Sequence, residues 1–262
     1  MNRIDAAFSR LKEENRKALI TFITAGDPDL DTSAEIIKTM ENSGADIVEI
    51  GIPYSDPIAD GPVIQNSSYK ALKAGFKINN LMKKVKDIRG CINIPLVYML
   101  YYNCIFKYGT EKFLEDCKSS GIDGIIIPDL PLEEREEFNK LCDKYDIYLI
   151  PLVAPTSNDR IEGIVNGAKG FVYCVSVAGV TGARSEIKTD IAEYMNQVAQ
   201  YTSVPKALGF GISNAEMAEK YKPYCDGVII GSAIVKLVDK YEDMNEMLKA
   251  VGEFVKEVKA VL

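Results

Sequence analysis

The feature that most constrains this chain is a repeat of eight apolar runs, each followed by a more polar segment, several of which show helical spacing. The runs are rich in Val, Ile and Tyr and are continuously apolar, which is typical of parallel strands buried on both faces. The predicted strands are residues 18–23, 46–52, 95–101, 124–129, 147–153, 170–176, 205–210 and 226–232.

The segments between these strands have the spacing of amphipathic helices. Residues 31–45 place Ile36, Ile37 and Met40 on one side, and several segments end in a glycine that fits helix termination. Eight β-then-α units without a linker predict an α/β fold, a single (β/α)8 TIM barrel with an extra N-terminal helix, and residues 1–262 as one catalytic domain. A doubly wound sheet would need a GxGxxG turn after the first strand, and "TFITAGDPD" lacks one.

Charge and composition exclude several classes of function. A net charge of −7 argues against nucleic acid as a partner, although backbone N–H groups can still hold a small anion locally. The chain has no histidine, which removes Ser–His and Cys–His pairs and zinc sites of the common types. Proton transfer near pH 7 then falls to Asp, Glu, Lys, Tyr, Cys or water.

Cysteine spacing and hydropathy indicate the compartment. The six cysteines form no CxxC pair, and we interpret them as free thiols in a reducing environment. The N-terminal residues contain no apolar run of the signal-peptide type, and no stretch approaches the ~18 apolar residues of a membrane span. We therefore expect a cytoplasmic protein with no membrane partner.

Two carboxylates stand out in "IVEIGIPYSDPIADGPVIQ", residues 47–65. Glu49 lies at the end of the second predicted strand, and Asp60 lies on the loop that follows, which Pro and Gly residues stiffen. Chemistry in barrels of this kind occurs at the C-terminal ends of the strands, so both residues are predicted to face the barrel mouth. An apolar wall should raise the pKa of Glu49 and suit it to carry a proton. The alternative is that Glu49 pairs with a buried lysine and Asp60 caps a helix.

Two glycine turns after the seventh and eighth strands predict a phosphate site. "GFGIS" at 209–213 and "GSA" at 231–233 are each followed by a helical segment, and Ser232 adds a hydroxyl donor. Backbone N–H groups at helix starts bind anions, and barrels often hold phosphate after these two strands. The long segment 176–191 is predicted to be a lid, from which Gly182 could complete the site.

The remaining positions at the mouth are apolar or aromatic and would suit a flat aromatic ligand. They are Phe22, Met99, Ile127, Tyr173, Phe210 and Ile229.

Three other readings remain open at this point. A sugar-phosphate isomerase could use Asp27 and Asp129, but this leaves Glu49 unexplained. A Schiff-base aldolase would need a lysine, and Lys206 lies at the start of the seventh strand, at the wrong end of the barrel. A barrel that binds a ligand and activates a partner without turnover is the third.

Taken together, these motifs resemble the alpha subunit of tryptophan synthase over essentially the whole chain. The matching segments are "FITAGDPD", "EIGIPYSDPIADGPVIQ", "IPDLPLEE", "APTS", "YCVSVAGVTGAR", "GFGIS" and "IIGSAIV". The resemblance implies retro-aldol cleavage of indole-3-glycerol phosphate to indole and glyceraldehyde 3-phosphate, for L-tryptophan synthesis. A stand-alone lyase that releases free indole is the alternative.

The resemblance also implies roles for particular residues. It makes Glu49 and Asp60 the catalytic pair, assisted by Tyr173 and Thr181. The implied phosphate contacts are Gly182, Gly211, Gly231 and Ser232.

A partner and its cofactor follow from the same resemblance. It implies a separate beta subunit that carries PLP and receives indole in an α2β2 heterotetramer, with no PLP or metal in this chain. Two positions depart from many members of the family. Cys104 stands where they have proline, which bears on partner affinity, and Val177 stands where some have arginine, which bears on the lid.

Overall fold

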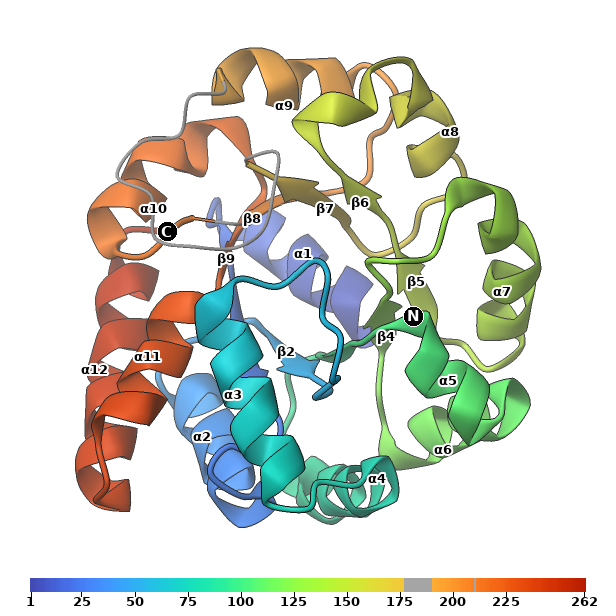
Figure 1. Cartoon of the computed structure of the whole chain (residues 1–262). Helices are drawn as coiled ribbons and strands as arrows, with labels where there is room; N and C mark the ends of the chain where they lie inside the picture. The colour runs from blue at the N-terminus through green and yellow to red at the C-terminus, as the bar shows by residue number, and fades with distance from the viewer. Residues whose placement is uncertain (177–189, 210) are drawn as a thin grey trace.

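A nearly closed barrel of parallel strands forms the centre of the molecule, and helices surround it (Figure 1). The computed structural model describes residues 1–176, 190–209 and 211–262. Each predicted strand is present, most of them one to three residues shorter, so the predicted barrel is confirmed. The strands are β1 (Ala18–Thr24), β2 (Ile47–Gly51), β3 (Leu96–Met99), β4 (Gly124–Ile126), β5 (Tyr148–Ile150), β6 (Leu152–Val153), β7 (Val172–Val175), β8 (Lys206–Gly209) and β9 (Gly227–Ile230).

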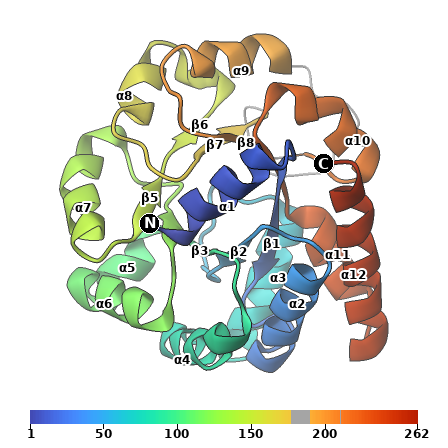
Figure 2. The ribbon, with the colours of Figure 1, turned by 180° about the vertical axis from the view of Figure 1, so that it is seen from behind.

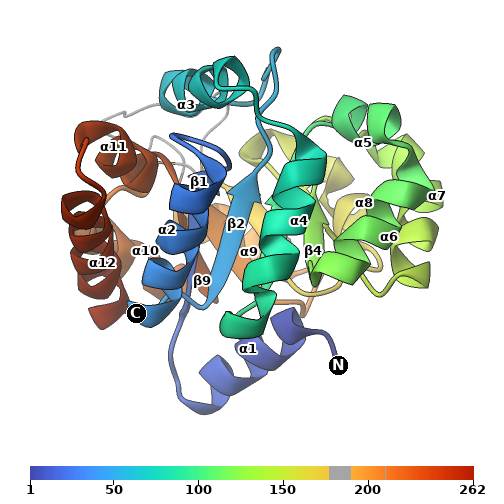
Figure 3. The same ribbon diagram turned by 90° about the horizontal axis from the view of Figure 1, so that it is seen from below.

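The helices lie mostly outside the barrel, and α1 alone crosses the end at which the strands begin (Figures 2 and 3). Short 3₁₀ turns span Arg89–Cys91, Pro155–Arg160 and Lys222–Tyr224. Within the described residues the helices are α1 (Arg3–Glu13), α2 (Leu30–Asn42), α3 (Pro62–Lys73), α4 (Ile78–Ile88), α5 (Tyr102–Tyr108), α6 (Thr110–Ser120), α7 (Leu132–Lys144), α8 (Ile161–Val165), α9 (Ile191–Ala199), α10 (Ala215–Tyr221), α11 (Ser232–Lys240) and α12 (Met244–Ala260). None of these helices has the length and apolar character needed to cross a membrane.

The fifth strand of the barrel is divided at Pro151, which explains why nine strands replace the expected eight. The sheet order is β5-β4-β3-β2-β1-β9-β8-β7-β6, so β5 pairs with β4 and β6 pairs with β7. Proline has no N–H to donate to a neighbouring strand, but its carbonyl accepts the Tyr173 N–H at 2.9 Å. The two short strands are thus consecutive parts of one barrel stave.

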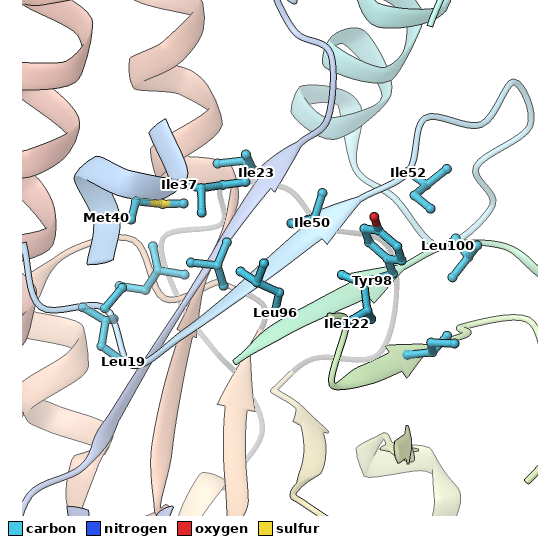
Figure 4. Packing of buried hydrophobic residues seen from close by; sticks show 14 of the residues in the cluster. Leu19, Ile23, Ile37, Met40, Ile50, Ile52, Leu96, Tyr98, Leu100 and Ile122 are labelled. Atoms are coloured by element: carbon cyan, nitrogen blue, oxygen red, sulfur yellow. The ribbon is translucent and has the colours of Figure 1, made fainter. Parts of the chain in front are cut away.

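Alternate residues of each strand face different layers, as the period of a β-strand requires. On β2, Val48 and Ile50 pack against the outer helices, whereas Ile47 faces the barrel interior. Figure 4 shows the outer layer, in which Ile37 and Met40 of α2 point toward β1. The inner layer includes Ile4, Phe8 and Leu11 of α1, together with Ile20, Ile47, Val97, Ile126, Ile150, Phe171, Tyr173, Ala207 and Ile229.

Three aspartates connect the N-terminal ends of neighbouring strands. Each one precedes a strand and accepts a backbone N–H from the start of the strand before it in the chain. Asp46 accepts from Leu19 at 2.8 Å and Asp123 from Leu96 at 2.9 Å. Asp226 accepts from Lys206 at 2.9 Å. These bonds brace the end of the barrel that lies away from the expected chemistry.

Candidate active site

Glu49 is a fully buried carboxyl group with no hydrogen-bond partner for either oxygen among the described residues. It lies on β2 with an exposed fraction of 0%. Burial disfavours the charged form and raises the pKa of Glu49 to about 8. No lysine in the described part of the chain forms a hydrogen bond with Glu49, so the alternative of a buried Glu49–lysine pair finds no support there. Near pH 7 the Glu49 side chain is therefore mostly protonated and can donate its proton.

Two aromatic neighbours share the surroundings of Glu49. Phe22 on β1 is its register partner, and it lines the same pocket. Tyr173 on β7 is also buried; burial and the charges of Glu49 and Asp60 raise its pKa well above the ordinary tyrosine value. Tyr173 thus keeps its proton and remains a hydrogen-bond donor.

Asp60 reaches the pocket from the loop between β2 and α3 and is half-buried. Burial raises the pKa of Asp60 to about 6, and a hydrogen bond with the Tyr101 hydroxyl counteracts part of this effect. At neutral pH Asp60 is therefore mostly ionised, whereas Glu49 is mostly protonated. One site thus holds an acid and an anion at the same time, which is the arrangement general acid catalysis needs.

A single pocket brings most of the predicted site residues together. It encloses about 470 Å³ of space, including its open mouth. The lining is apolar apart from two carboxyl groups, the Tyr173 and Ser232 hydroxyls and backbone groups at two glycines, which suits an aromatic ligand with a polar tail. The lining residues are Phe22, Glu49, Asp60, Ile64, Met99, Tyr173, Gly211, Ile212, Ile229, Gly231 and Ser232.

Both predicted phosphate turns contribute residues to this pocket. Gly211 has a φ of +93°, which a residue with a side chain adopts only at a cost. Gly231 caps α11, and a Cβ on it would come within 3.2 Å of the Phe22 Cβ. The first N–H groups of α11, which begins at Ser232, have no acceptor inside the helix. With the positive end of the helix dipole they form a place for an anion.

Three of the predicted contacts lie outside the described residues. These are Thr181, Gly182 and Phe210. The lid expected at 176–191 also falls mostly within this part, including Val177. Their roles stay predictions.

The structure places one predicted pocket residue elsewhere. Ile127 packs in the outer layer and lines a separate pocket with Pro128 and Arg135. Its neighbour Ile126, on β4, faces the barrel interior instead. The expectation was wrong by one residue, and one residue moves a side chain to the other face of a strand.

Sequence reasoning also missed three contributors to the site. Ile64 and Ile212 line the pocket, and the Tyr101 hydroxyl contacts Asp60. Ile64 and Ile212 lie inside quoted motifs, three and one residues after glycines assigned to turns, and their apolar character was the available signal. For Tyr101, the strand-end position was the only available signal.

The groups needed by two competing readings are engaged away from the pocket. Asp27 accepts a hydrogen bond from Ser67 Oγ at 2.5 Å, and Asp129 accepts the Tyr102 N–H at 2.9 Å. Lys206 begins β8 and forms an ion pair with Asp226 at 3.3 Å, at the far end of the barrel. An isomerase that uses both aspartates, or an aldolase that uses Lys206, therefore finds no support in this geometry.

All six cysteines are free thiols, four of them buried. Across the part of the chain that the structure describes, no group of three or more His, Cys, Asp or Glu side chains is placed to hold a metal ion.

Comparisons with known proteins agree with this geometry. The family model for the tryptophan synthase alpha chain matches residues 8–262. The tryptophan synthase alpha chain of Caldanaerobacter subterraneus subsp. tengcongensis is 62% identical over 262 residues, covering 100% of both chains. The crystal structure of tryptophan synthase subunit alpha from Legionella pneumophila str. Paris has a TM-score of 0.89 at 32% identity, covering 100% of this chain and 98% of that chain. A tryptophan synthase complex from Pyrococcus furiosus gives a TM-score of 0.83 at 34% identity, over 92% of this chain and 97% of that chain.

Proposed function

The chain belongs to the tryptophan synthase alpha chain family, and we propose that Glu49 and Asp60 are the pair with which it cleaves indole-3-glycerol phosphate. The reaction is a retro-aldol cleavage that yields indole and glyceraldehyde 3-phosphate. The observation that carries the assignment is the buried, unpartnered Glu49 in the same pocket as Asp60. We propose that residues 1–262 act as one catalytic domain.

The first step is protonation of the indole ring by Glu49. Indole is a poor leaving group until its C3 atom carries a proton, and a carboxyl group with a pKa near 8 is protonated in the resting enzyme. Protonation places positive charge on the ring nitrogen. Asp60, as an anion, accepts the N–H hydrogen bond and stabilises this charge.

The second step breaks the carbon–carbon bond. The glycerol hydroxyl next to this bond loses its proton to the Glu49 carboxylate, and its oxygen forms the aldehyde carbonyl. The bonding electrons return to the ring and restore neutral indole. The proton that Glu49 donated stays on C3 of indole, and the hydroxyl proton replaces it on Glu49, so the cycle needs no outside acid or base. Tyr173 assists as a neutral donor beside both carboxyl groups.

Substrate orientation follows from two kinds of group in the pocket. Phe22, Met99 and Ile229 offer apolar contacts to the ring. Gly211, Gly231 and Ser232 offer backbone N–H groups and a hydroxyl to the phosphate. Thr181, Gly182 and Phe210 lie outside the described residues, and we keep them as predicted substrate contacts. A substrate held at both ends places its reacting carbon near Glu49.

We also propose that the chain works with a beta subunit that carries PLP, in an α2β2 heterotetramer in the cytoplasm. Large apolar side chains are exposed near the barrel mouth, with Ile58 at 75% and Phe106 at 71%. A subunit contact over the barrel mouth would remove both of these side chains from water. Cys104 lies on α5 beside Phe106 and is half-buried. Size-exclusion chromatography with the beta subunit tests this, and Phe106→Asp should weaken the complex. The alternative of a stand-alone lyase has no support from the named relatives.

Two conservative substitutions test the catalytic pair. Glu49→Gln and Asp60→Asn preserve shape and remove the acid or the anion, and each should reduce indole release at least ~10²-fold. Asp143→Asn on α7 is the matched control, because Asp143 pairs with Lys169 on the protein surface. Near-normal turnover in either test variant, with or without the partner, would overturn the assigned role.

A further inference from the structure

Tyr101 holds the loop that carries Asp60. Tyr101 lies two residues after the end of β3 and is only 4% exposed. The hydroxyl oxygen accepts the backbone N–H of Ala59, the residue before Asp60, at 2.9 Å. A tyrosine hydroxyl has one proton to donate, and this contact leaves that proton free. The Asp60 carboxyl group is the neighbouring acceptor, and the Tyr101 hydroxyl lowers its pKa.

A second set of contacts fixes the ring of Tyr101 itself. The Tyr54 ring stacks on it with centroids 5.0 Å apart and an angle of 27° between the planes. The Tyr54 hydroxyl accepts a hydrogen bond from Asn103 Nδ2 at 3.2 Å. The loop after β2 is therefore fastened to the segment after β3 at both of its ends. Because stacked and buried rings have few rotamers, the hydroxyl has little freedom to leave Asp60.

We infer that Tyr101 is a positioning residue for the reaction, which fastens the loop at Ala59 and so holds the adjacent Asp60 carboxylate where it can accept the indole N–H. This inference rests on the proposed role of Asp60. A carboxylate on a loop is otherwise free to rotate, and a misplacement of about 1 Å can cost roughly 10²-fold in rate. Tyr101 touches Asp60 and its backbone, so it acts through Asp60 and takes no part in the bond-breaking steps.

The charges around Asp60 set the expected response to pH. Among the described residues the titratable groups that act on this site are Glu49 on β2, Tyr101 after β3, Tyr173 on β7 and Asp129 after β4. Burial raises the pKa of Tyr101, and so does the charge of Asp60, so it stays a neutral donor. The Tyr101 hydrogen bond lowers the pKa of Asp60. Removing the hydroxyl must therefore shift the ionisation of Asp60 to higher pH.

The test is Tyr101→Phe, which removes the hydroxyl and keeps the stacked ring. Its kcat should fall about tenfold with a small change in KM, because the lost contact orients a catalytic group. The acidic limb of its activity profile should move upward by about half a pH unit to one unit. Tyr148→Phe is the matched control, since Tyr148 donates to Asp5 at 2.7 Å at the opposite end of the barrel. This control should leave the profile unchanged.

A direct titration separates this inference from the function on which it rests. The ¹³C signal of the Asp60 carboxyl group, identified by its loss in Asp60→Asn, should titrate at higher pH in Tyr101→Phe. Replacing Tyr101 with 3-fluorotyrosine, a stronger donor of nearly equal size, should move the same titration to lower pH. An unchanged titration, or an equal loss of activity at every pH, overturns the positioning role. Normal turnover of Asp60→Asn would instead overturn the role of Asp60, while the titration still decides the contact.

Discussion

Phe22 of β1 and Glu49 of β2 are register partners on adjacent strands, and both side chains line the same pocket. The pairing places an aromatic ring beside a carboxyl group that has no hydrogen-bond partner among the described residues. The ring keeps water away from the carboxyl group and so favours its protonated form. The same ring is one of the apolar surfaces against which a bicyclic substrate can lie.

The activity of the enzyme should have a bell-shaped dependence on pH. Asp60 must be ionised, so kcat/KM should rise with pH through about 6. Glu49 must be protonated, so kcat/KM should fall again above about 8. Indole release measured between pH 5 and 9.5 at low substrate concentration checks both limbs, because kcat/KM reports the free enzyme. Activity that stays level through the alkaline range would contradict the role of Glu49 as the acid.

Replacing Glu49 with glutamine should stabilise the folded protein while it removes activity. The folded-state pKa of Glu49 is raised from 4.5 to about 8, so the buried carboxyl lowers stability as pH rises above 4.5. At pH 7 the expected gain for Glu49→Gln is roughly 3 kcal/mol, and it should vanish near pH 4. Urea unfolding at both pH values measures the difference. The exposed Glu115→Gln is the control, and a gain of equal size there would contradict the burial argument.

Adding one methyl group at Gly51 should displace the Phe22 ring, which lines the pocket. A Cβ there would lie 2.4 Å and 2.6 Å from two ring atoms of Phe22, so the ring must move. We expect Gly51→Ala to lower kcat/KM about tenfold and to cost about 1–3 kcal/mol of stability. Gly90→Ala, where no atom lies within 4 Å, is the control. The double variant Gly51→Ala with Phe22→Leu should regain stability, and its failure to do so would reject the clash as the cause.

The hydroxyl of Ser232 should contribute to binding of the phosphate and little to the chemistry. A hydrogen bond to a charged group contributes about 1.5–3 kcal/mol, so Ser232→Ala should raise KM for the substrate about 10- to 100-fold. The expected kcat is near normal, because the contact is present before and during the reaction. The exposed Ser119→Ala on α6 serves as the control. A loss in kcat with unchanged KM would place Ser232 in the chemical steps instead.

The strands were predictable from the sequence because each is a compact apolar run between turn residues. All eight are in place, and Glu49 and Asp60 line one pocket as their motif predicted. The face on which a residue lies was harder to predict where a run is apolar throughout. In "GIIIPD" no polar residue marks which isoleucine turns inward, and Ile127 was chosen where Ile126 faces the interior.

The contact between Tyr101 and Asp60 could not be read from the sequence at all. The two residues lie on different loops, and their meeting depends on how the chain turns after β2 and β3. The break at Pro151 has a similar cause, because its effect on pairing appears only when β4 and β7 are placed on either side. Contacts between segments that are distant in the sequence depend on the three-dimensional fold, which the local sequence pattern does not specify.

Helix α1 covers the N-terminal end of the barrel, so the two ends of the barrel differ. Ile4, Phe8 and Leu11 pack into the inner layer at the end where the strands begin. The pocket that holds Glu49 and Asp60 is built instead from strand ends and loops at the opposite end. A partner that collected indole from this pocket would therefore sit over the loops through which the next substrate also arrives.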